Sequence, residues 1–116
     1  MKEASMDDSI LDTIKQLLGI QYDYTAFDTD IIVHINSAFM ALNQLGVGPT
    51  ECFFIESSDE AWSDFVDKSI DLEAVKTYIY LKVRTIFDPP SSSVVMEAMN
   101  RNISELEWRL NVQAEK

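Results

Sequence analysis

The sequence predicts an all-α fold: a compact bundle of about four to five helices, with a long, partly extended loop between the second helix and the following short helix. Apolar residues recur three and four positions apart in four segments, which is the spacing of one helix face. Capping residues, glycine or proline stand at the ends of these segments. Only ECFFI, residues 51–55, has the composition of a strand, and no run of equal strength lies nearby to pair with it.

The first predicted helix lies in DDSILDTIKQLLG, residues 7–19. We expect Asp7 or Asp8 to cap it and Gly19 to end it. Its apolar residues share one face of a helix: Ile10, Leu11, Ile14, Leu17 and Leu18. A polar and aromatic connection, GIQYDYTAFDTD, follows.

The second predicted helix is capped by Asp28 and ends at Gly46, shortly before Pro49. Its predicted core residues have the same helical spacing: Ile31, Ile32, Ile35, Ala38, Phe39, Leu42 and Leu45. His34 lies at the edge of this stripe without a recognisable catalytic partner, so we expect a surface or half-buried histidine.

After Pro49 we expect an extended segment at 51–55 and then a short helix in SDEAWSDFVD, capped by Ser58 or Asp59. Large apolar side chains in that helix should hold the loop to the body of the domain: Trp62, Phe65 and Val66.

The next helix is predicted in DLEAVKTYIYLKVRTIF, residues 71–87. Its main stripe is Leu72, Val75, Ile79, Val83 and Ile86. Large side chains also occupy the other faces, which indicates a helix contacted on several sides: Tyr78, Tyr80 and Leu81.

Two adjacent prolines, Pro89 and Pro90, must stop this helix near Phe87. A serine can then cap the last helix, which makes the connection a short rigid corner: Ser91, Ser92 or Ser93.

The last predicted helix, about residues 94–113, has two apolar faces. One suits the core: Val95, Met96, Met99, Ile103, Leu106 and Leu110. The other carries Val94, Ala98, Trp108 and Val112, and is interrupted by Arg101 and Glu105, which can pair at i, i+4. Trp108 either covers an edge of the core or contacts another subunit, since Trp and Arg concentrate binding energy at interfaces.

The 116 residues fit one domain, 1–116, with flexible ends expected at 1–5 and 114–116. A single cysteine, Cys52, cannot form an internal disulfide. No apolar run reaches the length of a membrane span and no secretory signal is recognisable, so we expect the protein to stay where it is made.

The charge is strongly one-sided. The chain has 20 acidic and 9 basic residues and a net charge of -11. Between Lys15 and Lys68 there is no Lys or Arg, so this half of the chain cannot bind the phosphates of a nucleic-acid backbone. The acidity either keeps the protein soluble, meets a basic partner, or lets DNA pass without adhering.

No catalytic, cofactor-binding or metal-binding motif is present. The three glycines are explained as turns or helix ends, which leaves no glycine-rich phosphate cradle. Asp59, Glu60 and Asp64 lack the glycine and the oxygen spacing of a calcium loop, so we expect solvated acids. We therefore predict no enzyme activity, no cofactor and no metal.

Several segments together resemble a known family. The most specific are FDTDI (27–31), FDPPSSS (87–93) and ELEWRLN (105–111), within a similarity that extends roughly from Ile10 to Val112. The chain resembles the small helical head-tail connector proteins of tailed phages that infect Gram-positive bacteria, and of their prophages.

The resemblance implies a structural role. Such proteins form a ring, generally of twelve subunits, that docks beneath the portal, extends the DNA channel and offers a platform to a downstream connector or tail-completion protein. They are not enzymes, and double-stranded DNA passes through without specific binding. The resemblance thus implies a virion protein of the head-tail interface, made in the cytoplasm of a bacterial host.

Two groups of residues become candidates under this resemblance. The last helix offers an interface to the portal or a neighbouring subunit: Val94, Ala98, Arg101, Glu105, Trp108, Arg109 and Val112. The acidic loop offers a channel lining: Glu51, Glu56, Asp59 and Glu60. Two other classes stay open: an acidic DNA mimic or other protein-interaction domain that inhibits a nucleic-acid-binding partner, and a small hydrolase or metal-dependent enzyme.

Overall fold

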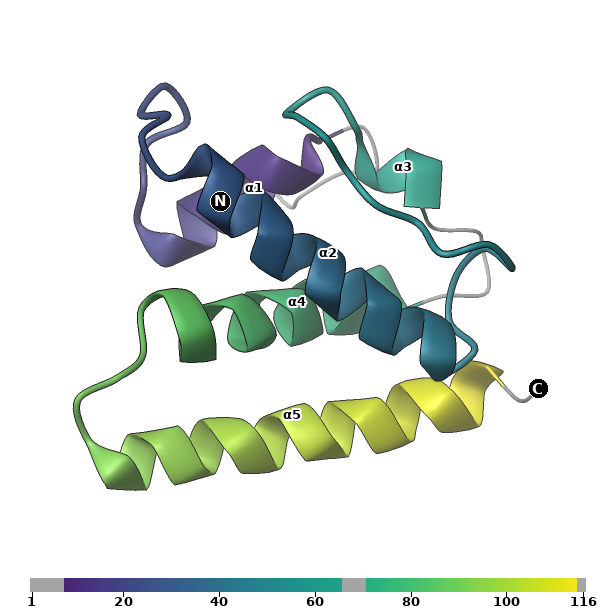
Figure 1. Cartoon of the computed structure of the whole chain (residues 1–116). Coiled ribbons are helices and arrows are strands. Elements are labelled where there is room, and N and C mark those ends of the chain that lie inside the picture. The colour runs from purple at the N-terminus through teal and green to yellow at the C-terminus, as the bar shows by residue number, and fades with distance from the viewer. Residues whose placement is uncertain (1–7, 66–70, 115–116) are drawn as a thin grey trace.

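The computed structural model describes residues 8–65 and 71–114, and these form a helical globule (Figure 1). Five helices follow one another, as the sequence predicts: α1 (Ile10–Leu18), α2 (Asp28–Gln44), α3 (Trp62–Phe65), α4 (Leu72–Phe87) and α5 (Ser93–Ala114). The described ranges contain no strand, only one isolated antiparallel bridge between Ser9 and Ala61. The tail predicted at 1–5 lies outside these ranges, and Ala114, predicted in the flexible end, is the last residue of α5.

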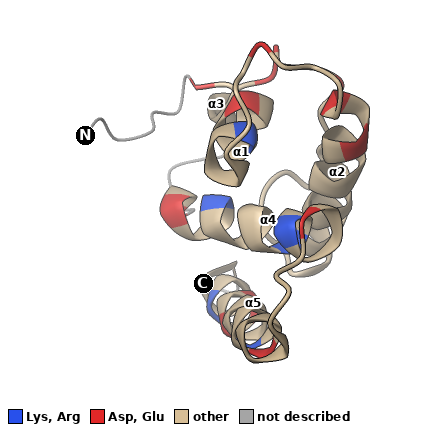
Figure 2. Ribbon diagram, turned by 90° about the vertical axis from the view of Figure 1, so that its left-hand side faces the viewer, with Lys and Arg blue, Asp and Glu red and all other residues tan. Residues whose placement is uncertain are grey.

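Helix α4 occupies the centre of the bundle and packs against α1, α2 and α5. In both views α5 lies on the opposite side of α4 from α1 and α2 (Figures 1 and 2). Val75, Tyr78, Ile79 and Val83 are fully buried, while Tyr80 and Leu81 are half-buried. The predicted contact of this helix on several sides is therefore confirmed.

Helix α1 begins at a different cap from the predicted one. The N–H of Asp12 donates to Ser9 Oγ (3.2 Å), so Ser9 caps α1 in place of Asp8, and Asp7 lies outside the described residues. At the other end Gly19 has φ 84°, the left-handed conformation that glycine adopts without a steric penalty. The predicted end of α1 is thus confirmed.

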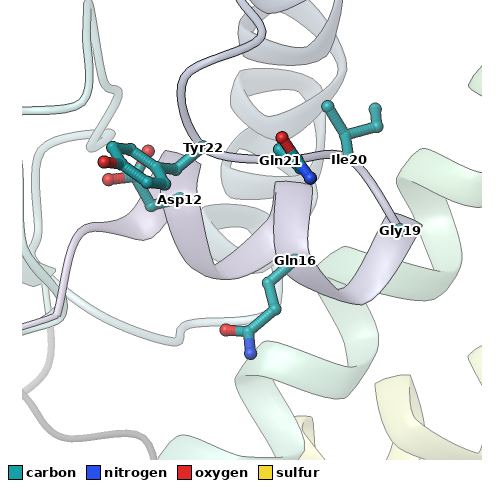
Figure 3. A pocket seen from close by; sticks show the side chains of 6 residues that line it. All are labelled: Asp12, Gln16, Gly19, Ile20, Gln21 and Tyr22. Atoms are coloured by element: carbon teal, nitrogen blue, oxygen red, sulfur yellow. The ribbon is translucent and has the colours of Figure 1, made fainter.

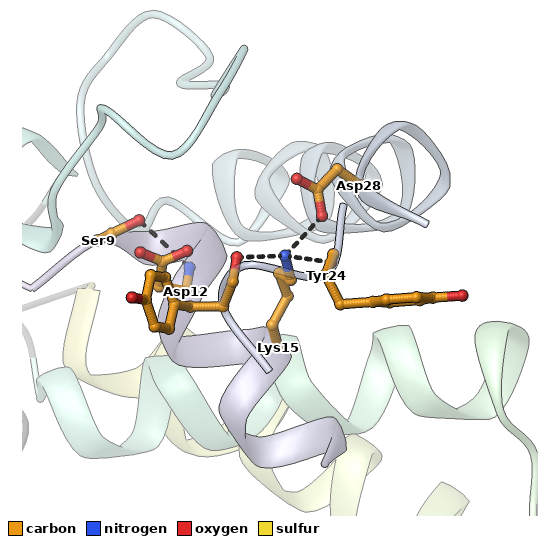
Figure 4. A network of polar contacts seen from close by, with 6 residues as sticks. Ser9, Asp12, Lys15, Tyr24 and Asp28 are labelled. Atoms are coloured by element: carbon orange, nitrogen blue, oxygen red, sulfur yellow. Dashed lines mark hydrogen bonds and ion pairs between the residues drawn. The ribbon is translucent and has the colours of Figure 1, made fainter. Parts of the chain in front are cut away.

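The sequence predicts that Asp28 caps α2, and this prediction is wrong. Asp28 is the first helical residue, and its carboxylate forms an ion pair with Lys15 instead (Figure 4). Lys15 is 1% exposed, and its Nζ lies 2.8 Å from Asp28 Oδ1. The same ammonium donates to the carbonyls of Tyr22 (2.9 Å) and Tyr24 (2.8 Å). A buried ammonium needs such partners, and this need outweighs a local capping bond.

The loop between α2 and α3 is attached to the core by side chains. Asn36 on α2 accepts from the N–H of Ile55 (2.8 Å) and donates to its carbonyl (2.9 Å), and Ile55 is buried. The predicted extended segment at 51–55 is thereby held along α2 without joining a sheet. Trp62 and Phe65 are buried as predicted, and Trp62 Nε1 donates to Thr13 Oγ1 on α1 (3.1 Å).

The predicted start of α3 is wrong, because neither Ser58 nor Asp59 caps it. The helix begins later, at Trp62, and Asp64 accepts from the N–H of Ala61 (2.9 Å). Val66, predicted to hold the loop, lies outside the described residues.

The double-proline corner is confirmed. Helix α4 ends at Phe87, and the N–H of Val95 donates to Ser92 Oγ (3.3 Å) at the start of α5. Tyr78 on α4 also donates to Glu107 Oε2 on α5 (2.7 Å), which ties the two helices together beyond the corner.

Three residues predicted in the core are exposed: Leu17, Ile86 and Val95. Leu17 and Ile86 lie in the last turns of α1 and α4, and Val95 lies in the first turn of α5. The ends of these helices extend past the packed middle of the bundle, so helical spacing alone overestimates their burial. None of the helices described is long and apolar enough to cross a membrane.

Replacing Lys15 with Met should lower the free energy of unfolding by about 3 kcal/mol, because the Asp28 carboxylate and two carbonyls lose a buried partner. Urea denaturation followed by tryptophan fluorescence measures this. Asp28→Asn is the milder control, since an amide oxygen still accepts from Lys15. A loss below about 1 kcal/mol for Lys15→Met would show that the network contributes little to the fold.

The pKa of Tyr78 is raised above its usual 10.0 by burial and then by its hydrogen bond to the Glu107 carboxylate. Above about pH 10 the unfolded chain loses this phenolic proton while the folded chain keeps it, so stability should fall as the pH rises. Tyr78→Phe should make that decline shallower in urea titrations from about pH 8 to pH 11. Equal slopes for both proteins would contradict the assignment.

Candidate interaction surfaces

The outer face of α5 comprises the seven predicted interface residues: Val94, Ala98, Arg101, Glu105, Trp108, Arg109 and Val112. At ~3.6 residues per turn they share an arc of about 100°, opposite the side of α5 that is buried against the bundle. Trp108 is 68% exposed and Val94 72%. Trp108 therefore does not cover an edge of the core, which was one of its two interpretations.

The charges on this face pair differently from the prediction. Glu105 lies 3.5 Å from Arg109, and not beside Arg101 as predicted. Both arginines are one turn from Glu105, but a glutamate that precedes its basic partner has the more favourable orientation in a helix. Both members of the pair are largely exposed, so it adds little stability and leaves the arginines available at the surface.

The acidic loop divides into exposed and structural carboxylates. Glu51, Glu56 and Asp59 are exposed. Glu60 is half-buried, and its two oxygens accept from the N–H groups of Glu56 (2.9 Å) and Ser57 (3.2 Å). Glu60 thus shapes the loop, and the other three present their charge to solvent.

A second exposed surface, the outer face of α2, is absent from the sequence-based candidates. Val33 and Met40 are each 56% exposed, and Ser37 and Asp30 are exposed on the same side of the helix. The sequence pattern that indicates this surface is the seven-residue spacing of Val33 and Met40, opposite the core stripe. The pattern is hard to recognise because α2 has many other apolar residues.

The connection between α1 and α2 exposes a group of aromatic side chains. Tyr22 is 73%, Tyr24 51% and Phe27 42% exposed. Phe27 lies between Tyr24 and Phe87, with ring centroids 5.7 and 5.4 Å apart. Lys15 on α1 donates to the carbonyls of Tyr22 and Tyr24, so the loop that carries these rings is held against α1.

A surface pocket beside α1 brings together few ionisable groups (Figure 3). It is lined by Asp12, Gln16, Gly19, Ile20, Gln21 and Tyr22. Asp12 supplies the single carboxylate of this lining, so the pocket itself contains no pair of acids for general acid-base chemistry. Within 8–65 and 71–114, no group of three or more His, Cys, Asp or Glu side chains is arranged to hold a metal ion.

A family model described as phage connector protein matches residues 10–116. The chain belongs to this family. The match begins with the first residue of α1 and spans every helix of the bundle, so membership concerns the whole fold. No curated protein and no solved structure gives a significant match. As a phage connector protein, the chain is a component of the phage particle, and the family resemblance drawn from the sequence is confirmed.

Trp108→Ala should change the free energy of unfolding of this connector by less than about 0.5 kcal/mol, because the indole is mostly in solvent. Trp62→Ala is the matched control: that side chain is 0% exposed, and its loss should cost about 3 to 5 kcal/mol. Thermal and urea denaturation of both variants make the comparison. A large loss of unfolding free energy for Trp108→Ala would show that this side chain contributes to the core.

Proposed function

We propose that this phage connector forms a ring at the head-tail interface of the virion, docks on the portal, extends the DNA channel and provides the platform for tail attachment. The ring contains about twelve subunits, the number that the family resemblance implies. One observation carries the proposal: a family member exposes a tryptophan, 68% accessible, on a helix face where Val94, Arg101, Glu105 and Arg109 are also exposed and Ala98 and Val112 are half-buried.

This face has the composition of a protein interface. Tryptophan and arginine supply most of the binding energy in many interfaces, and Arg101 and Arg109 flank Trp108. Contiguous exposed apolar surface marks interaction sites, and the exposed Trp108 has the half-buried Val112 one turn further along the same face. A second copy of the chain, the portal, and a downstream connector or tail-completion protein are the partners proposed.

The fold also supports the passage of DNA without adhesion. In Figure 2 the basic residues lie on α1, α4 and α5, and acidic residues mark the start of α2 as well as α4 and α5. The basic residue of α1, Lys15, is buried and paired with Asp28, so it adds no positive charge to the surface. The described part of the stretch after Lys15, residues 16–65, therefore presents negative charge, which does not attract phosphates.

The proposed role is structural, without catalysis or a cofactor, in a protein made in the cytoplasm of the bacterial host. An acidic DNA mimic needs an exposed array of acids. The apolar outer face of α5 favours assembly over this alternative, because a mimic is recognised through its array of acids and not through an apolar helix face.

Mixing the purified chain with the portal protein of the same phage should give rings stacked on the portal, visible by negative-stain electron microscopy and by mass measurement. Trp108→Ala should reduce the bound fraction at least about tenfold while the melting temperature stays nearly unchanged. A chain that ignores the portal and instead binds a DNA-handling enzyme would overturn the proposal in favour of the mimic.

A further inference from the structure

The outer faces of α2 and α5 are two exposed surfaces on opposite sides of α4. Each is uncovered at large apolar residues: Val33 and Met40 on α2, and Val94 and Trp108 on α5. Because α2 and α5 both pack on α4 by their inner faces, their outer faces point away from one another. A chain with two different apolar faces on opposite sides can bind copies of itself head to tail.

The two faces differ in the size of their exposed side chains. Ser37 stands between Val33 and Met40 along α2, four residues after the first and three before the second. A small residue between two longer apolar ones leaves space on a helix surface for a large side chain. Trp108 is the largest exposed side chain of α5, so it is the side chain of that face that would fill such a space.

Their charges are complementary in the same register. Asp30 precedes Ser37 by seven residues, and Arg101 precedes Trp108 by seven. Seven residues are two helical turns, or about 10 Å. If the indole of Trp108 lies over Ser37 and the two helices run in the same direction, the guanidinium of Arg101 lies opposite the carboxylate of Asp30.

The direction of the helices is compatible with this register. Within one chain α2 and α5 both run from left to right in Figure 1 but are inclined to one another, and their C-terminal ends meet where Asn111 Nδ2 donates to the carbonyl of Leu45 (3.1 Å). The rotation between neighbouring copies of a ring changes the angle between α2 of one copy and α5 of the next, and the contact requires that this rotation bring the two helices close to parallel.

We propose that Trp108 of one copy packs over Ser37 of the next copy, between Val33 and Met40, and that Arg101 pairs with Asp30 across the same contact. This inference rests on the proposed ring and specifies the contact between its subunits. The two faces are different surfaces, so the contact is heterologous and repeats from subunit to subunit until the ring closes.

The test is a charge exchange between Asp30 and Arg101, measured as rings bound to the portal protein of the same phage. Asp30→Arg and Arg101→Glu each place like charges opposite one another, and each should reduce ring assembly at least about tenfold. The double variant restores opposite charges and should recover most of the assembly. Asp23→Arg, which makes the same charge change on the exposed α1–α2 connection, is the matched control and should assemble normally.

Circular dichroism melts establish that each variant is folded, and recovery in the double variant itself excludes misfolding as the cause. Rings that form normally with either single reversal would overturn the inference and leave the proposed function intact. Loss in both singles without recovery in the double would also overturn it, because the two charges would then meet different partners. A wild-type chain that never associates with the portal would overturn the proposed function as well.

Discussion

Helix α4 imposes the constraint on which the other helices depend. Its fully buried residues Val75, Tyr78, Ile79 and Val83 share an arc of about 140°, and the half-buried Tyr80 and Leu81 extend the apolar surface beyond it. A helix of this kind is stable only if neighbours cover it on several sides. Covering it fixes α1, α2 and α5 around it, and the outer faces of α2 and α5 are left in solvent. The proposed assembly surfaces are thus the reverse sides of the helices that bury α4.

The helices could be predicted from the sequence, whereas several of their caps could not. The three- and four-residue spacing located α1, α2, α4 and α5, because burial of one face is the main determinant of a helix in a small domain. In an acidic chain many residues can cap a helix, and local sequence does not rank them. Asp28 illustrates the difficulty, since its carboxylate binds Lys15 on another helix.

The family motifs prove to be positions of tertiary contact. FDTDI supplies Asp28 to the Lys15 network, and FDPPSSS makes the corner. ELEWRLN supplies Glu107 to Tyr78 and Asn111 to the carbonyl of Leu45. This explains why the sequence identified a family while it offered no catalytic residue. The outer face of α5 was predictable because Trp108 lies opposite the core stripe. That of α2 was not, since Val33 and Met40 are surrounded in sequence by other apolar residues.

The buried ammonium of Lys15 has a consequence for the resilience of the subunit. It joins α1, the aromatic connection and α2 at one point, much as a disulfide closes a loop. Unlike a disulfide, this junction forms without an oxidant, and it can break and form again on the timescale of local opening. A subunit in which this junction opens therefore regains its native contacts without any change in covalent bonds.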